Sequence, residues 1–352
     1  MSQLLSFGSV MSYIGYLCVA ILILLLMVTI HEFGHYCAGK MLKFKIDEFS
    51  VGFGKALFQK KNKKTGEVFS LRLFPLGGYC AFAGENEDGS SEGSFNSQKP
   101  WKRLIVFFAG AFFNFLSAII FSFILLVSFG YEHVQITGFA DFSPNVGKFE
   151  VGDVVYKVGD KDIDFVYDRT FTALISEYKL GDSIQVTVKR NGKMVTIDDV
   201  QLANVGTAEE PLLKLGVNLK TYRYSFLESL ALCVPFTLRW CWKIMIILWM
   251  LITGKLGLSN VGGPITTVTT IATYSRLNPA NLLLLLPVIA TNLAVFNLLP
   301  FPALDGSHMV FTTIEWIRGK PINRKVENTI NNVGLIILLG FVVLVDILHF
   351  LV

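Results

Sequence analysis

Several long apolar segments constrain the fold of this 352-residue chain more than any other feature. Hydrophobic residues make up 52% of the sequence and charged residues only 16%. An apolar run of about 20 residues is long enough to cross a bilayer as a helix. The runs lie at 14–30, 104–129, 226–253, 282–304 and 333–352. The sequence therefore predicts a multi-pass α-helical membrane protein.

The distribution of charge predicts how the chain is oriented. Residues 37–103 contain twelve Lys or Arg, which by the positive-inside rule places this loop in the cytoplasm and the N-terminus outside. The net charge of +4 is too small to indicate a nucleic-acid partner. The five cysteines include no C-x-x-C pair, so neither disulfides nor a thiolate metal site is expected.

The first apolar segment, about 12–36, ends in His31-Glu32-Phe33-Gly34-His35. On a helix, this spacing places His31 and His35 one turn apart on one face, where both imidazoles can bind one Zn²⁺. Glu32 is the expected catalytic base, which takes a proton from water activated by the metal. The alternative is a histidine pair satisfied by helix packing, but ionisable groups inside a membrane segment are costly and usually functional.

A catalytic zinc site needs a third protein ligand, and Asp305 is the best candidate. It follows the apolar segment 282–304, and Pro300 and Pro302 break the helix just before it. His308 is a rival ligand, and Asp305 could instead only cap the next helix. Asp346 and His349, near the end of the last segment, are expected at the membrane interface.

Residues 131–220 contain fourteen acids and ten bases and are expected to form a soluble domain. Strands are predicted at 153–158, 183–190 and 193–197, with a type I′ turn at Asn191-Gly192. A helix is expected at 167–178. The glycine spacing and element order resemble a PDZ domain of the permuted bacterial type. A separate β-hairpin is predicted at about 66–84, in the cytoplasmic loop.

Motifs along nearly the whole chain resemble a bacterial site-2 protease of the regulator of sigma-E protease type, in the M50 class. These motifs are HEFGH, Pro75-Leu76-Gly77-Gly78-Tyr79, Asn114 in the second segment, Gly262-Gly263-Pro264 and the NLLPFPALDG run that ends at Gly306. The resemblance implies one Zn²⁺ held by His31, His35 and Asp305, with Glu32 as the base. One PDZ-like domain is expected, whereas larger family members carry two.

The resemblance also implies where a substrate binds. A loop around 70–83 would pair with an unwound substrate segment by strand addition, and the polar positions beside the aspartate would hold or polarise the substrate backbone. For Asn292 and Asn297 the alternative is a hydrogen bond between helices. The expected substrate-binding residues are Gly77, Gly78, Asn292, Asn297, Pro300 and Pro302.

Bringing Asp305 to the depth of the two histidines constrains the topology. Segment 282–305 must run from outside to inside, so 226–253 must not cross. Residues 221–280 are therefore predicted to form amphipathic helices on the membrane surface, consistent with Glu228, Arg239 and Lys243. Four spans result, at about 12–36, 104–129, 282–305 and 333–352, within core halves 1–130 and 281–352.

The expected function is intramembrane cleavage of single-span membrane proteins, such as an anti-sigma factor or a signal-peptide remnant, after a first cut. The expected location is the bacterial inner membrane, with both termini and the PDZ-like domain in the periplasm and the active site toward the cytoplasm. The PDZ-like domain would screen substrates or bind a peptide or protein ligand. The alternatives are a quality-control metalloprotease acting on exposed loops and a non-catalytic membrane adaptor.

Overall fold

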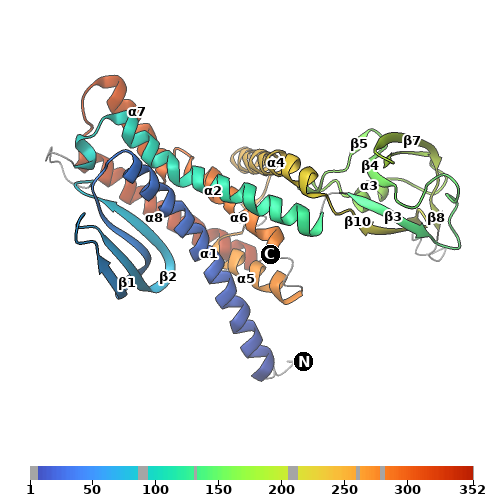
Figure 1. Cartoon of the computed structure of the whole chain (residues 1–352), viewed down its shortest axis with the longest axis horizontal. Coiled ribbons are helices and arrows are strands. Elements are labelled where there is room, and N and C mark those ends of the chain that lie inside the picture. The colour runs from blue at the N-terminus through green and yellow to red at the C-terminus, as the bar shows by residue number, and fades with distance from the viewer. Residues whose placement is uncertain are drawn as a thin grey trace. The chain divides into compact units, whose positions relative to one another are not determined.

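The computed structural model describes residues 7–85, 94–130, 133–204, 213–258, 262–277 and 282–351. They form two compact units, one of Met1–Phe121 with Ile244–Val352 and the other of Ser122–Lys243. Helices α2 (Pro100–Phe129) and α4 (Phe226–Ile252) each contribute to both units (Figure 1).

Helices dominate the first unit. Besides parts of α2 and α4, they are α1 (Phe7–Met41), α5 (Pro264–Leu277), α6 (Leu282–Asn297), α7 (Asp305–Arg318) and α8 (Arg324–Leu351). A short 3₁₀ helix, η1 (Phe95–Ser97), precedes α2. Four helices share one buried cluster, in which small residues let the backbones approach closely. Its buried members are Ala20, Met27, Ala118, Ile271, Ile289 and Ala290.

Four described helices are long and apolar enough to cross a membrane: α1, α2, α4 and α8. The number agrees with the expected four spans, but the helices are not the same, because α4 stands in place of the expected span 282–305. The expected span 282–305 is divided, because α6 ends at Asn297 and α7 begins at Asp305, with both prolines between them. The segment 226–253 is one helix of 27 residues rather than several amphipathic ones.

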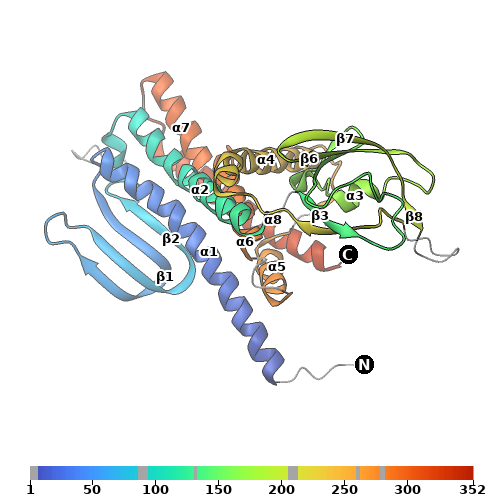
Figure 2. The same cartoon turned by 45° about the vertical axis from the view of Figure 1, so that its right-hand side comes forward.

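A small sheet of β1 (Ile46–Lys61) and β2 (Val68–Phe82) lies beside α1 (Figures 1 and 2). Residues 48–51 pair with 78–81 on one side and with 68–71 on the other, and 56–61 pair with 68–72. The sheet therefore has the order 56–61, 68–71, 48–51, 78–81. The predicted hairpin within 66–84 is wrong in its partners, because β1 bends at Gly52 and Gly54, both with positive φ, and pairs with both halves of β2.

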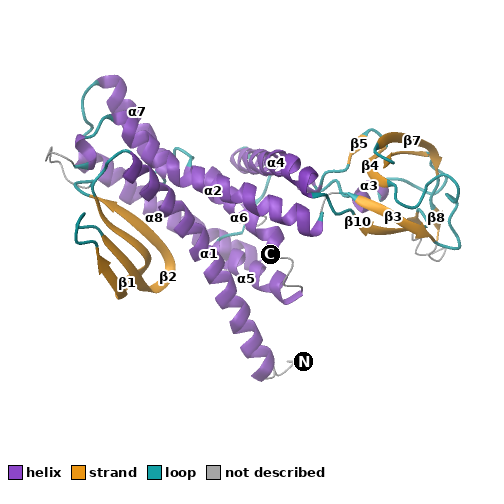
Figure 3. Cartoon of the chain, in the orientation of Figure 1, coloured by secondary structure: helices purple, strands orange, loops and turns teal. Residues whose placement is uncertain are grey.

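The second unit contains the remaining strands (Figure 3). Its main sheet has the order β10-β3-β4-β6-β7, with β5 paired to β4, and β8 pairs with β9 in a second sheet. A buried aliphatic core that includes Ile136, Val155 and Val186 lies against the main sheet. The strands are β3 (Val134–Phe139), β4 (Val154–Val158), β5 (Lys161–Asp162), β6 (Ile184–Arg190), β7 (Lys193–Val200), β8 (Ala203–Asn204), β9 (Leu213–Lys214) and β10 (Val217–Thr221).

The three strands predicted in this unit are confirmed as β4, β6 and β7. Asn191 and Gly192 both have positive φ, as a type I′ turn requires. The predicted helix 167–178 is wrong in its extent, because Asp168 is left-handed and ends a 3₁₀ turn, η2 (Phe165–Tyr167). Thr170 then caps the short helix α3 (Phe171–Ile175), accepting a hydrogen bond from Ala173 N–H.

Candidate metal centre

Two histidines near the C-terminal end of α1 form one side of the candidate metal centre. His31 and His35 are buried, with 8% and 7% of their surfaces exposed. Their four-residue separation brings the two Nε2 atoms to 3.2 Å from each other. The helical HExxH geometry is therefore present in the structure.

Asp305, the first residue of α7, completes a group of three side chains that could bind one metal ion. Its Oδ2 lies 3.0 Å from His31 Nε2 and 3.4 Å from His35 Nε2, and this oxygen is buried without a hydrogen-bond donor. Among the described residues, His31, His35 and Asp305 form the one group of at least three His, Cys, Asp or Glu residues whose ligand atoms lie within 4.8 Å of one another. Two nitrogen donors and one carboxylate oxygen facing one point suit Zn²⁺ with an open fourth position.

His308, the rival ligand, lies outside this group. Its Nδ1 is 3.2 Å from Glu327 Oε1, and its ring stacks on Phe107 with the ring centroids 5.1 Å apart. The interruption between helices α6 and α7 thus brings Asp305, rather than His308, to the two histidines.

Hydrogen bonds behind the imidazoles orient them. His35 Nδ1 lies 2.8 Å from the Val106 carbonyl oxygen, so Nδ1–H donates and Nε2 keeps its lone pair for a metal. His31 Nδ1 is 3.3 Å from the Asn114 amide and 3.4 Å from that of Asn297. With the same tautomer, His31 Nδ1–H must donate to an amide oxygen. The Asn114 amide presents its nitrogen to His31, and its oxygen has no hydrogen-bond partner. Exchanging the two Asn114 amide atoms would satisfy both groups.

Close contact between α1 and α2 depends on two glycines. A Cβ at Gly34 would lie 2.4 Å from the Ala109 carbonyl oxygen, and a Cβ at Gly110 would lie 2.4 Å from His35 Nε2. Neither position can accept even a methyl group without separating the helices. The glycine inside HEFGH therefore has a packing reason, and Gly110 is a site residue that the sequence reading missed.

Glu32 lies within electrostatic range of both histidines and Asp305. It also borders the small sheet, since a Cβ built on Gly78 would lie 3.6 Å from Glu32 Cγ. Gly78 belongs to the strip 78–81 at one edge of that sheet. In the described part of the chain, this strip pairs with β1 along one side only.

The other expected substrate-binding residues lie on α6, in β2 and in the loop between α6 and α7. Asn297 reaches His31, as above, whereas Asn292 lies half-buried on α6 and Gly77 borders the ring of Phe53. Pro300 is exposed and Pro302 is half-buried, both in the loop between α6 and α7. The structure thus brings Gly78 and Asn297, of the six, next to His31 or Glu32.

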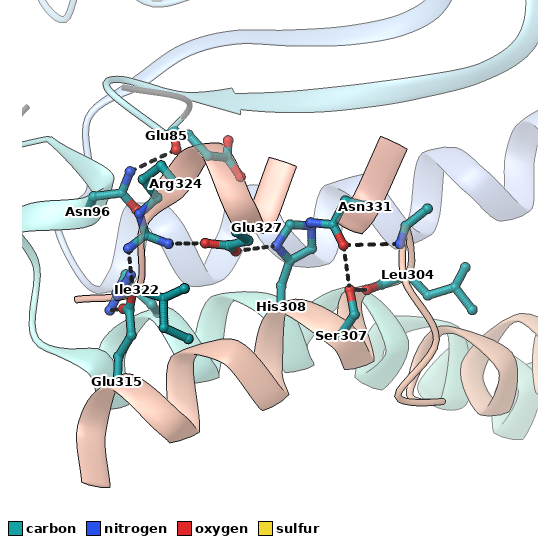
Figure 4. Close-up of polar contacts among 12 residues, drawn as sticks. Glu85, Asn96, Leu304, Ser307, His308, Glu315, Ile322, Arg324, Glu327 and Asn331 are labelled. Carbon is teal, nitrogen blue, oxygen red and sulfur yellow. Dashed lines mark hydrogen bonds and ion pairs between the residues drawn. The ribbon is translucent and has the colours of Figure 1, made fainter. Parts of the chain in front are cut away.

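Residues of α8 support the loop that carries Asp305 (Figure 4). Asn331 Oδ1 accepts hydrogen bonds from Ala303 N–H at 3.3 Å and from the Ser307 hydroxyl at 3.2 Å. One turn later, a Cβ at Gly334 would lie 2.1 Å from Pro302 Cβ. The sequence reading missed both residues, because Asn331 lies in a polar stretch that precedes the last apolar segment and no local pattern distinguishes it.

A chain of charged side chains continues from this loop (Figure 4). Glu327 binds His308 and Arg324, and Arg324 Nη2 lies 2.8 Å from Glu315 Oε1. Glu315 also accepts from buried Arg103 of α2. Because each charge has an opposite partner, the network can be buried and can join α2, α7 and α8 near the metal centre.

Asp346, which is expected at the membrane interface, has a structural role inside the protein. It is 4% exposed and caps α5, accepting hydrogen bonds from Gly263, Ile265 and Thr266 N–H at 3.1 Å each. A carboxylate at a helix N-terminus is stabilised by the unpaired N–H groups there. This contact explains the second glycine of the Gly262-Gly263-Pro264 motif, since a Cβ at Gly263 would lie 2.6 Å from the Asp346 carboxylate.

Comparison with known proteins identifies the family of the chain. The family model described as Peptidase family M50 matches residues 19–341, and the chain belongs to that family. It is 29% identical to a Clostridium perfringens protein over 94% of this chain and 97% of the relative. It is also 29% identical to a Fusobacterium nucleatum protein over 94% of this chain and 96% of the relative. The names of both relatives contain the words "zinc metalloprotease". The chain is therefore a metallopeptidase.

Proposed function

We propose that this chain is an intramembrane zinc endopeptidase in which His31, His35 and Asp305 hold the metal. The observation that carries the proposal is the convergence of these three side chains, from helices that begin nearly 300 residues apart, at the end of a long apolar helix. When bound there, zinc supplies Lewis-acid activation of water and of the scissile carbonyl. The remaining chemistry belongs to side chains of this protein.

Glu32 is proposed as the general base and acid. Its carboxylate would take a proton from the attacking water and return it to the nitrogen of the leaving amine. Its place between the histidines and the sheet edge supports this role, because a peptide along that edge would present its carbonyls beside the carboxylate.

The strip 78–81 is proposed to hold the substrate by strand addition. A transmembrane helix hides its backbone carbonyls in its own hydrogen bonds, so a segment must unwind before it is cut. An extended substrate paired with the unpaired edge beside Gly78 would regain its backbone hydrogen bonds next to Glu32. Gly77, which precedes this strip, would leave room for the substrate.

The amides around His31 are proposed to divide two tasks. His31 Nδ1–H can donate fully to one acceptor, and Asn114, whose oxygen has no other partner, is suited to that position. Asn297 is then free to hold a substrate carbonyl, with Asn292 one to two turns before it on α6. Pro300 and Pro302 would shape the loop that lines this path.

The charges of α4 favour a place on the membrane surface for this helix, although it is long enough to cross. Within the second unit, Glu228 pairs with Lys189 at 3.1 Å, Arg239 with Asp164 at 3.1 Å and Lys243 with Asp168 at 2.9 Å. The three ion pairs are spread along about 22 Å of the helix, from Glu228 to Lys243. This part of the helix therefore faces a charged domain rather than lipid. Large exposed apolar side chains recur every three or four residues along the helix, as in an interfacial helix: Leu230, Val234, Leu238, Trp242, Met245 and Trp249.

Four spans are then proposed, formed by α1, α2, α8 and the segment of α6 with its following loop. Sixteen residues of α6 measure about 24 Å, less than the thickness of about 30 Å for a bilayer core. The helix therefore ends inside the membrane, where Asp305 can meet the histidines. The proposed location is the bacterial inner membrane, with the active site toward the cytoplasm and the termini in the periplasm.

The domain of β3 to β10 is proposed to be a periplasmic PDZ-like domain. Its β-sheet with a short helix and its permuted strand order support this assignment. It would bind a peptide or screen single-span substrates, such as an anti-sigma factor or signal-peptide remnant, whose outer domain has already been removed. Cleavage of such a reporter with and without its outer domain tests this role.

A pair of variants tests the ligand assignment. Asp305→Ala should lose zinc, whereas His308→Ala should retain it, since His308 binds Glu327 instead. Loss of zinc from His308→Ala alone would reverse the assignment. A full complement of zinc in both variants would place the third ligand elsewhere.

A further inference from the structure

The turn between β1 and β2 carries a concentrated positive charge. Lys60, Lys61, Lys63 and Lys64 fall within five positions, and all four are exposed. Among the described residues, none of these four lysines forms an ion pair with a carboxylate. Glu67, the nearest acid in sequence, is buried and already pairs with Lys40 at 2.6 Å. Among the described residues, the charge of the turn is therefore uncompensated.

An aromatic cavity of about 660 Å³ adjoins this turn. Its apolar wall includes Tyr36 of α1 and Phe49 of β1, with ring centroids 5.3 Å apart, and Phe69 of β2, stacked on Phe49 at 5.8 Å. The same cavity is lined by Lys60, Lys61 and Lys63, and by Glu67, whose carboxylate is paired with Lys40. One side of the cavity is thus apolar and the other strongly basic.

We propose that this cavity binds an anionic phospholipid of the cytoplasmic leaflet, with the headgroup phosphate on the lysines and an acyl chain against the aromatic wall. The division of the cavity into a basic and an apolar side matches the two parts of such a lipid. Tyr36 lies near the C-terminal end of α1, in the position where aromatic and basic side chains meet the interface of a bilayer. Exposed apolar residues on the same sheet, including Leu57 and Leu71, extend the surface that lipid would cover.

The inference rests on the proposed membrane location and is independent of proteolysis. Binding is therefore measured directly, by native mass spectrometry of the full chain titrated with phosphatidylglycerol or phosphatidylcholine. The test variant is K60Q/K61Q/K63Q. The matched control is K45Q/K55Q/K99Q, which removes the same charge from exposed positions outside the cavity.

The wild type and the control should bind phosphatidylglycerol at least about ten-fold more tightly than phosphatidylcholine. The test variant should lose affinity for phosphatidylglycerol on the order of a hundred-fold, since each of the three lysines near a charged lipid surface contributes about 1 kcal/mol, or about a five-fold factor. Equal losses in the two triple variants would overturn the proposal, because they would indicate general surface charge. Unaltered binding in the test variant would overturn it as well.

Two competitors distinguish a lipid from other anions. Inorganic phosphate and a soluble acidic peptide should displace phosphatidylglycerol only at far higher concentrations than a second anionic lipid. Displacement by phosphate at lipid concentrations would make this a free-anion site, and efficient displacement by the peptide would make it a protein-docking site. With Phe69→Trp as a reporter, brominated phosphatidylglycerol should quench the added fluorescence, and an absence of quenching would exclude a chain in the cavity.

Discussion

Asn331 accepts a hydrogen bond from the backbone N–H of Ala303, at 3.3 Å, and thereby fixes the loop two residues before Asp305. Ala303 has a φ of 75°, which is unfavourable for a residue with a side chain. A contact from α8 thus stabilises the conformation that turns Asp305 toward His31 and His35.

Replacing Asn331 with Leu should weaken zinc binding by roughly ten-fold to a hundred-fold, the usual effect of removing a group that orients a metal ligand. Asn331→Asp keeps the acceptor and should retain most of the affinity. Competition with a chromophoric chelator measures both. Asn332→Leu, at the exposed neighbouring position, is the control, and an equal loss there would attribute the effect to α8 rather than to the hydrogen bond.

Gly110→Ala should reduce both zinc content and peptidase activity to near background, because the new methyl group would lie 2.4 Å from His35 Nε2. Gly15→Ala, on α1 with open space around it, should leave both unchanged. Zinc analysis of the purified variants decides the matter. Normal zinc in Gly110→Ala would mean that α1 and α2 can separate without cost.

His133 should make the second unit less stable in acid. Burial, and then the nearby charge of Arg239, lower its pKa from 6.5 to about 4. The unfolded chain therefore binds this proton more readily than the folded one, so the stability is fully present above pH 6.5 and is lost as the pH falls toward 4. The loss approaches about 3 kcal/mol at 1.36 kcal/mol per pKa unit.

Hydrogen exchange of β3 and β10 in the intact protein, compared at pH 7.5 and 4.5, measures this loss. His133→Gln has no titrating ring and should show a smaller difference between the two pH values. A pH dependence identical to that of the wild type would assign the effect to other groups.

Reporter fusions at residues 215 and 270 should both report the periplasmic side. This result is expected if α4 lies on the surface through its pairs with Asp164 and Asp168. Opposite sides would show that α4 crosses, which would break the proposed direction of α6.

The sequence was most informative where the chemistry lies on one element. The spacing of His31 and His35 predicts their shared face, and the prolines before Asp305 predict the break that the structure shows. Contacts between distant segments were not predictable in the same way. Gly110 matters only because α2 passes close to His35. The strand β1 was not predicted, because glycines such as Gly52 and Gly54 are typical of loops. In the structure both have positive φ, and the strand bends at them.

Cleavage of a single-span reporter by the wild type and by Glu32→Gln, with zinc measured in both proteins, tests the central claim most directly. The wild type should cut the reporter within its membrane segment, and Glu32→Gln should retain zinc while its rate falls at least about a hundred-fold, as expected for loss of a general base. Equal cleavage by both proteins would contradict the role of Glu32. Failure of both to cut, with zinc absent from the wild type, would favour a non-catalytic membrane adaptor.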